Sequence, residues 1–315
     1  MKSLEDLRRL YDSSLSSELK ALESKRKGLL FCYILPVLVD IVLTVALIIY
    51  FKSLHPTLIT TLSIAGVATF VFYIFMGGRA AKYRLEFKNK VVRKIVELLN
   101  PEWEYEANSF IRPSEYKKSE LFTTGFDDYK GDDLIHGLID KTDFFLSELH
   151  TRYKERSGKS ETWHTIFKGL FAHADFNKEI TTKTFVIPEN ANLFGKIGRK
   201  IGQWERGKLV SLENKEFSKS FAVYSQDQIE ARYILTPVMM EAIVNLRKQF
   251  NKKIHISFVG SRVYVAIPFK KDLFEPKLYR SGVRYSDVET MYHQFNTISI
   301  IISEMNLNTR IWTKN

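Results

Sequence analysis

The sequence predicts a cytoplasmic α+β domain with a mostly antiparallel sheet, attached to an N-terminal two-helix transmembrane hairpin. Two long apolar runs, residues 28–51 and 57–76, lie close together near the N-terminus. From about residue 108 the chain changes to short β-like runs, which helices interrupt without regular β-α-β alternation. We therefore expect a membrane module over residues 1–107 and a cytoplasmic domain over residues 108–315.

Both apolar runs are long enough to cross a bilayer. The first contains a single charged residue, Asp40, and the second contains none. A hydrocarbon core of about 30 Å needs roughly 20 apolar residues in a helix. A cleaved signal peptide is the alternative for the first run, but a polar segment precedes it and a second run follows almost at once. Two transmembrane helices are the better interpretation.

The basic residues around these runs predict their orientation. Seven Lys or Arg residues precede the first run, seven follow the second within residues 79–94, and the loop over residues 52–56 has one. Positive charge is enriched on the cytoplasmic side of membrane proteins. Both termini are therefore expected in the cytoplasm, with a cytoplasmic helix over residues 79–100.

Two apolar stripes flank the membrane runs. In each stripe the apolar residues recur at spacings of three and four, as on one face of a helix. The stripes are Leu4, Leu7, Tyr11, Leu15, Leu19 and Leu22 before the runs, and Tyr83, Phe87, Val91, Ile95 and Leu98 after them. We expect the two helices to pack as an antiparallel stalk; the alternatives are a lipid surface or another subunit.

The cytoplasmic domain has clear local signals for strands and helices. Two hairpins are predicted, around Asp140-Lys141-Thr142 and around Gly260-Ser261, where two residues with Gly suit a primed turn. Thr236-Pro237 is a helix N-cap followed by Pro at the first helical position. Further strands are expected over 163–176, 184–187, 209–213 and 221–224, further helices over 227–235 and 286–305, and a loop over 153–159.

Composition and motifs exclude several common classes. There is no GxG, GxxxxGK[ST], HExxH or GxSxG sequence, and the one cysteine, Cys32, lies in a membrane run. The net charge of +11 is explained by the juxtamembrane clusters, which anionic lipid headgroups attract, rather than by nucleic-acid binding. No cofactor is predicted.

Two polar clusters contain residue types that can ligate metals. His164 and His173 are nine residues apart, so they lie on opposite faces of one straight strand, and His173 with Asp175 supplies only two ligands. The acidic stretch 127–133 lacks the ligand spacing of a calcium loop and is expected to be a solvated turn. No metal site is predicted.

A basic segment in the cytoplasmic domain is expected to contact the membrane surface. Lys196, Arg199, Lys200 and Trp204 accompany apolar residues at helical spacing, as in a basic interfacial helix. Several glycines weaken that helix, and a flexible basic loop is the alternative.

Asp40 is the residue whose position most needs an explanation, because a carboxylate within a span is costly. Thr44 lies on the same side of the first helix, and Thr69 lies at about the same depth in the second. We expect the Asp40 carboxyl to donate a hydrogen bond to Thr69 or to Thr44. An intersubunit contact and ion or proton coupling are the alternatives.

Several phrases of the cytoplasmic domain resemble a bacterial membrane-protein family, the domain of unknown function 3137. They are Tyr129-x-Gly131-x-Asp133-Leu134 with Gly137, the stretch from Phe217 through Val223 and Asp227 to Leu235-Thr236-Pro237, and Leu307-Asn308-Thr309-Arg310-Ile311-Trp312. The resemblance covers roughly residues 110–315. It implies a bacterial origin, a place in the cytoplasmic membrane and a LemA-type membrane protein as a candidate partner, and it assigns no catalytic residue.

The favoured function is a membrane-anchored binding or scaffolding module that contacts a membrane protein partner or further copies of itself. The membrane anchor, the two apolar stripes and the absence of catalytic motifs support it. A membrane-tethered enzyme, for example a hydrolase, and a small ion-coupled device built around Asp40 are the alternatives. A deep pocket with convergent polar groups would favour the enzyme.

Overall fold

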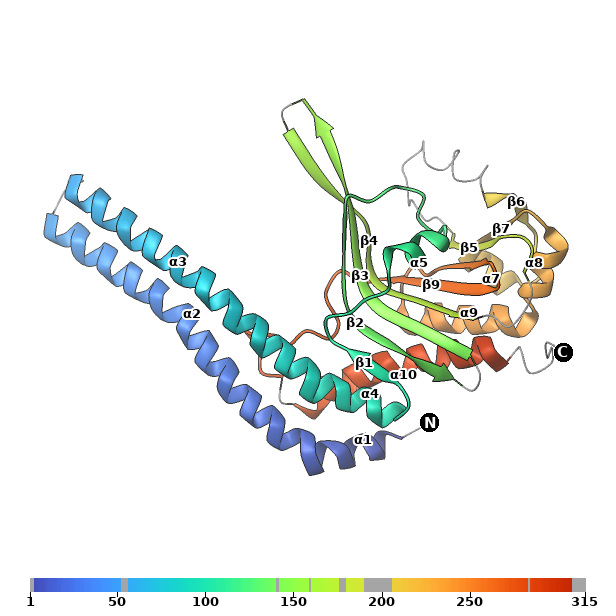
Figure 1. The fold of residues 1–315 in the computed structure, drawn as a ribbon, viewed down its shortest axis with the longest axis horizontal. Coiled ribbons are helices and arrows are strands. Elements are labelled where there is room, and N and C mark those ends of the chain that lie inside the picture. Colours follow the sequence, from blue (N-terminus) through green and yellow to red (C-terminus); the bar gives the residue numbers. More distant parts are fainter. Residues whose placement is uncertain are drawn as a thin grey trace. The chain divides into compact units, whose positions relative to one another are not determined.

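The chain forms two compact units in the computed structural model (Figure 1). The first unit combines Met1–Leu98 with Phe274–Tyr292, and the second combines Leu99–Leu273 with the chain from His293. The residues that the structure describes are 3–51, 56–139, 142–158, 160–175, 180–189, 206–282 and 284–307.

Two long antiparallel helical arms make up most of the first unit. The first arm is α1 (Leu4–Leu10), the π-helix η1 (Tyr11–Leu15) and α2 (Ser16–Phe51); the second is α3 (Pro56–Phe87), the π-helix η2 (Lys88–Val92) and α4 (Arg93–Leu99). Ser3 and Asp6 form a reciprocal capping box at the start of α1. Both arms contain a stretch long and apolar enough to cross a membrane, by length and composition.

The two apolar stripes face each other, and the predicted antiparallel stalk is confirmed. Seven of their side chains are at most 3% exposed: Leu7, Leu15, Leu19, Leu22, Phe87, Val91 and Ile95. Ion pairs from Lys25 to Glu86 at 2.7 Å and from Lys94 to Glu18 at 2.6 Å join the arms beside this core. Because the two stripes bury each other, neither a lipid surface nor another subunit is needed to cover them.

Residues 274–292, here called the strap, return to the stalk from far along the chain. Glu275 forms an ion pair with the buried ammonium group of Lys88 at 2.8 Å. Arg26, held by Glu23, donates a hydrogen bond to the carbonyl oxygen of Leu278 at 2.5 Å. Tyr285, the first residue of α10 (Tyr285–Leu307), packs edge-on against a tyrosine of η1. No local pattern in the sequence predicts that this segment belongs to the stalk.

A nine-stranded antiparallel sheet organises the second unit, in the order β1-β2-β3-β4-β9-β8-β5-β7-β6. The strands are β1 (Glu104–Glu106), β2 (Asp128–Ile139), β3 (Thr142–Ser157), β4 (Ser160–Asp175), β5 (Thr184–Pro188), β6 (Lys208–Val210), β7 (Phe221–Ser225), β8 (His255–Val259) and β9 (Arg262–Pro268). Its helices are α5 (Pro113–Lys118), α7 (Lys215–Ser220), α8 (Gln228–Ile234) and α9 (Pro237–Phe250). The predicted α+β class with an antiparallel sheet is confirmed.

The sheet buries apolar side chains on both faces. One face, here called the α5 face, carries Phe167, Phe171 and Tyr264 and is covered by the segment around α5, whose Tyr116 packs on Phe171. The opposite face is covered by α9, where Arg247 lies over the ring of Phe221. The apolar residues of α9 point into this second layer.

Several predicted elements are found within a residue or two of their expected limits. The hairpins β2–β3 and β8–β9 form as expected, and Ser261 adopts the positive φ of 61° that its tight turn requires. Thr236 caps α9 by accepting a hydrogen bond from the amide of Met239. β1, α5 and α7 were not predicted, because each is six residues or shorter.

Three expectations differ from the structure. Residues 153–157, expected in a loop, continue β3, and pair with β4 in a two-stranded arm beyond the end of β9 (Figure 1). The acidic stretch expected to be a turn lies mostly in β2, where Asp133 is buried and accepts a hydrogen bond from the Tyr105 hydroxyl. The expected boundary at residue 107 falls later than in the structure, because β1 already pairs with β2.

Candidate functional site

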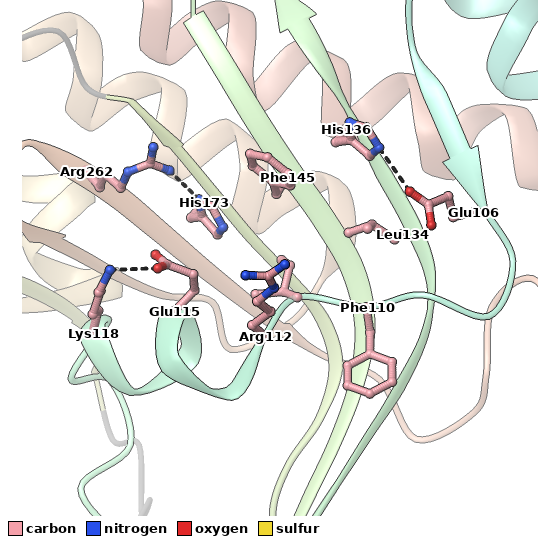
Figure 2. A pocket seen from close by; sticks show the side chains of 11 residues that line it. Glu106, Phe110, Arg112, Glu115, Lys118, Leu134, His136, Phe145, His173 and Arg262 are labelled. Carbon is pink, nitrogen blue, oxygen red and sulfur yellow. Dashed lines mark hydrogen bonds and ion pairs between the residues drawn. The ribbon is translucent and has the colours of Figure 1, made fainter.

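A groove of about 490 Å³ opens on the α5 face of the sheet, and we call it the α5 groove (Figure 2). Its walls come from β1, β2, β3, β4, β9 and the segment leading into α5, so strand register and the course of that segment together position it. It is lined by Glu106, Phe110, Ile111, Arg112, Glu115, Lys118, Leu134, His136, Phe145, His173 and Arg262.

His173 and Arg262 are the central polar pair of the groove. The Arg262 guanidinium lies 2.8 Å from His173 Nδ1 and 3.1 Å from a carboxylate oxygen of Asp143. Burial, and then the neighbouring Arg262 charge, lower the pKa of His173 to about 4. Since arginine has only donors, His173 accepts at Nδ1 and carries its proton on Nε2. His173 is therefore fixed as a neutral hydrogen-bond donor.

The other charged side chains of the groove are of both signs. Burial raises the pKa of Glu115, whereas the hydrogen bond that Lys118 donates to its carboxylate at 2.7 Å lowers it. The pKa of Glu115 is lowered on balance. His136 approaches Glu106 at 3.3 Å and stacks on Phe145 at 5.5 Å. Arg112 is exposed and has no acidic partner among the residues that the structure describes. The groove thus combines an aromatic floor with side chains of both charges, and the described residues supply no acidic partner for the guanidinium of Arg112.

The groove places hydrogen-bond donors and acceptors beside an apolar floor, a combination that ligand pockets share. The described residues that line the groove include no serine, threonine or cysteine beside the histidines. His173 cannot act as a base through Nδ1 while Arg262 occupies that atom. In the part of the chain that the structure describes, no three His, Cys, Asp or Glu side chains converge as metal ligands.

The structure brings Asp40 and Thr69 together across the two helical arms. The Thr69 hydroxyl donates a hydrogen bond to a carboxylate oxygen of Asp40 at 2.7 Å, whereas the expected donor was the Asp40 carboxyl. The Thr44 hydroxyl instead donates to the Asp40 backbone carbonyl, one helical turn away, at 2.7 Å. One turn towards the stalk, Tyr73 stacks on Tyr33 at 5.6 Å and donates to its carbonyl oxygen.

The basic segment lies outside the described residues. Lys196, Arg199, Lys200 and Trp204 are all in the range 190–205, so their expected membrane contact remains a prediction.

Sequence reasoning missed most of the α5 groove. His173 was weighed only as a metal ligand and rejected as one, and neither Arg262 nor Arg112 was singled out. His173 meets Arg262 only because β4 pairs with β9 in one particular register, in which Asp175 lies opposite Arg262. An Arg at the start of a predicted strand was the one available signal, and it is a weak one.

Comparisons with known proteins match part of the chain. No curated protein matches the chain. A solved structure, the crystal structure of the mycobacterial trehalose monomycolate transport factor A, TtfA, is similar with a TM-score of 0.34 and 12% identity, over 66% of this chain and 94% of that one. The family model described as protein of unknown function (DUF3137) matches residues 165–307. The match begins after the Tyr129–Gly137 phrases and ends before most of the Leu307–Trp312 phrase. Over residues 165–307, from β4 to the end of α10, the predicted resemblance to the DUF3137 family is confirmed.

Proposed function

We propose that this protein is a membrane-anchored binding module whose α5 groove holds a polypeptide segment of a membrane protein partner. The anchor is the pair of apolar stretches in α2 and α3. In the most apolar 18-residue stretch of each arm, the buried share of the residues is 0% in the first arm and 6% in the second. Packing within the chain therefore does not explain why these stretches are apolar. Large apolar side chains such as Val42, Ile49 and Phe70 are more than 60% exposed. A bilayer is the solvent that suits such a surface.

The distribution of basic residues supports an orientation with both termini in the cytoplasm of a bacterial cell. Lys and Arg are concentrated at the ends of the arms distant from the connecting loop. We expect the exposed members of those clusters that have no acidic partner to contact anionic headgroups. The sheet unit then lies on the cytoplasmic side, where a neighbouring membrane protein, a LemA-type protein among the candidates, presents its cytoplasmic segments.

The mixed lining of the α5 groove is the observation that carries the choice of a polypeptide ligand. Phe110 and Phe145 supply an apolar floor, and Arg112 and Glu115 supply opposite charges within the same groove. The fixed donor at His173 Nε2 suits a backbone carbonyl. A polypeptide carries apolar, charged and carbonyl groups in close succession, and ligand sites of this kind combine an apolar lining with a few placed polar groups.

A photo-crosslink from the groove tests the proposal in the full chain within its native membrane. A benzophenone amino acid replaces Phe110, and adducts are resolved by mass. We expect one adduct with a defined second protein. We expect Arg112→Glu to reduce it about tenfold, because a charge-assisted hydrogen bond contributes about 1.5–3 kcal/mol. The matched control is Lys219→Glu, a charge reversal at an exposed position of α7 outside the groove.

The mass of the adduct distinguishes the partners. An adduct of twice the chain mass identifies a second copy as the occupant in place of another protein. No adduct, or an adduct that both charge reversals reduce equally, contradicts the proposed role of the groove.

A further inference from the structure

A second cavity, of about 630 Å³, lies at the other end of the α5 segment, and we call it the lysine cavity. It is formed where β4, β8 and β9 meet the turn after α9. Phe122, which belongs to the apolar core of the α5 face, also lines it. It is lined by Phe122, Thr165, Ile166, Phe167, Lys168, Asn251, Lys252, Lys253, His255, Pro268, Phe269 and Lys270. No residue of this set lines the α5 groove.

The floor of the lysine cavity is apolar and partly aromatic. Phe122 and Phe167 pack with tilted rings whose centroids are 5.1 Å apart, and both side chains are buried. Phe269 packs edge-on against Phe250 at 5.8 Å, which fixes the opposite wall. Ile166 and Pro268 complete a concave apolar surface. A cavity of this size and lining is in the range that binds small organic ligands.

The rim carries four ammonium groups and, among the described residues that line it, no carboxylate. Lys168 reaches Asp272 at 2.9 Å, just outside the cavity. Lys252 lies over the ring of Phe269 at 5.6 Å, and neither it nor Lys270 has an acidic partner among the residues that the structure describes. The rim therefore has a positive charge that the described part of the chain does not neutralise.

A buried neutral histidine adds an unmet hydrogen-bonding requirement to the wall of the cavity. His255 is 4% exposed, and neither ring nitrogen has a hydrogen-bond partner of ordinary geometry among the described residues. Burial, and then the nearby charges of Arg206 and Lys253, lower the pKa of His255 to about 3. A buried polar group without a partner is costly. An anion in the cavity would offset these charges and give the imidazole an acceptor.

We propose that the lysine cavity binds a single-chain amphipathic anion, in which a carboxylate or phosphate is attached to an acyl chain. The acyl chain lies on the floor between Phe122, Ile166 and Phe269. The anionic group lies at the rim, where Lys252 and Lys270 pair with it. A neutral apolar molecule would leave the rim charges unmatched, and a free small anion would leave the floor unused. This inference does not depend on the ligand proposed for the α5 groove.

The test uses the full chain in nanodiscs of zwitterionic lipid and a long-chain fatty acid that carries a diazirine. Labelled peptides are identified by mass spectrometry, and the corresponding fatty alcohol is the neutral control. We expect saturable labelling by the acid within residues 165–168 or 251–255, and at least several-fold weaker labelling by the alcohol. Ile166→Trp, which fills the floor and leaves all lysines in place, should reduce labelling by the acid.

Charge variants separate a site from a general effect of net charge. The double variant Lys252→Gln with Lys270→Gln should raise the half-saturating concentration of the acid by about tenfold or more. The matched control, Lys215→Gln with Lys219→Gln, removes the same charge from α7 and should leave it unchanged. All four lysines are exposed, so folding is expected to persist, and thermal unfolding of each variant verifies this.

Three results would overturn the proposal. The first is equal labelling by acid and alcohol, and the second is an equal effect of the two lysine pairs. The third is absence of labelling by the monomeric acid, while sedimentation with vesicles of anionic phospholipid depends on Lys252 and Lys270. That last outcome would identify the lysines as a contact for membrane headgroups outside the cavity.

Discussion

Glu148 on β3 makes the stability of the sheet unit depend on pH. Its side chain is 6% exposed and accepts a hydrogen bond from the amide of Leu273 at 2.8 Å. Burial, and then the nearby Asp133 carboxylate, raise the pKa of Glu148 from 4.5 to about 8. Between these pH values the folded chain holds a proton that the unfolded chain has released. The stabilising contribution is therefore complete below pH 4.5 and is lost as the pH rises through about 8.

The size of the effect follows from the same values. Each pH unit in this interval lowers the free energy of unfolding by about 1.4 kcal/mol, which gives about 5 kcal/mol over the whole interval. Glu148→Gln removes the titration but keeps an oxygen that can accept from Leu273. At pH 5 the two proteins should be similar in stability. At pH 8 the Gln variant should be more stable by several kcal/mol.

Tryptophan fluorescence during urea unfolding at pH 5, 6, 7 and 8 measures this difference. Trp103 and Trp163, the tryptophans among the residues that the structure describes, both lie in the sheet unit, so their signal reports on it. Glu155→Gln, at an exposed position of the two-stranded arm, is the matched control and should parallel the wild type. The reasoning is refuted if the difference in the free energy of unfolding between the wild type and the Glu148→Gln variant is the same at every pH from 5 to 8.

Three further outcomes are expected. Gly169→Ala should unfold the sheet unit or cost several kcal/mol, because its Cβ would lie 2.1 Å from a carbonyl oxygen of β9; Gly125→Ala, with nothing within 4 Å, should cost little, and equal thermal stabilities would contradict this. Asp40→Asn should preserve folding and cellular function while Asp40→Leu costs about 1 kcal/mol; a folded, abundant but inactive Asn variant would favour titration of Asp40 instead. In a background without Cys32, an impermeant thiol reagent should label Ser53→Cys in intact cells and Ser160→Cys only after lysis, and labelling at 160 in intact cells would reverse the orientation.

Local patterns in the sequence were sufficient where neighbours in the chain are also neighbours in space. The turn at Gly260-Ser261, the cap at Thr236 and the stripes through Leu15 and Val91 each depend on a few consecutive residues. Their periodicity and turn chemistry therefore predicted them correctly.

Contacts between distant segments could not be predicted in this way. The α5 groove depends on the β4–β9 pairing and on the course of residues 109–118, and neither leaves a period in the sequence. In the sequence Lys88 is one of several charges in a basic cluster. Its burial depends on the ion pair with Glu275, which is far away along the chain. Glu148 gave no signal, because a carboxylate in a strand of alternating pattern normally faces solvent.

The strap imposes an order of events on biosynthesis. The stalk helices leave the ribosome first, but the chain that supplies Glu275 and Leu278 follows only after residues 99–273 have been made. At the usual rate of translation this delay is about 10–35 s. During that time the ammonium group of Lys88 and the guanidinium of Arg26 lack these strap partners, although both helical arms have already been made. The strap-binding surface of the stalk is thus accessible to chaperones, proteases and partner chains during synthesis. In the finished protein the strap covers that surface.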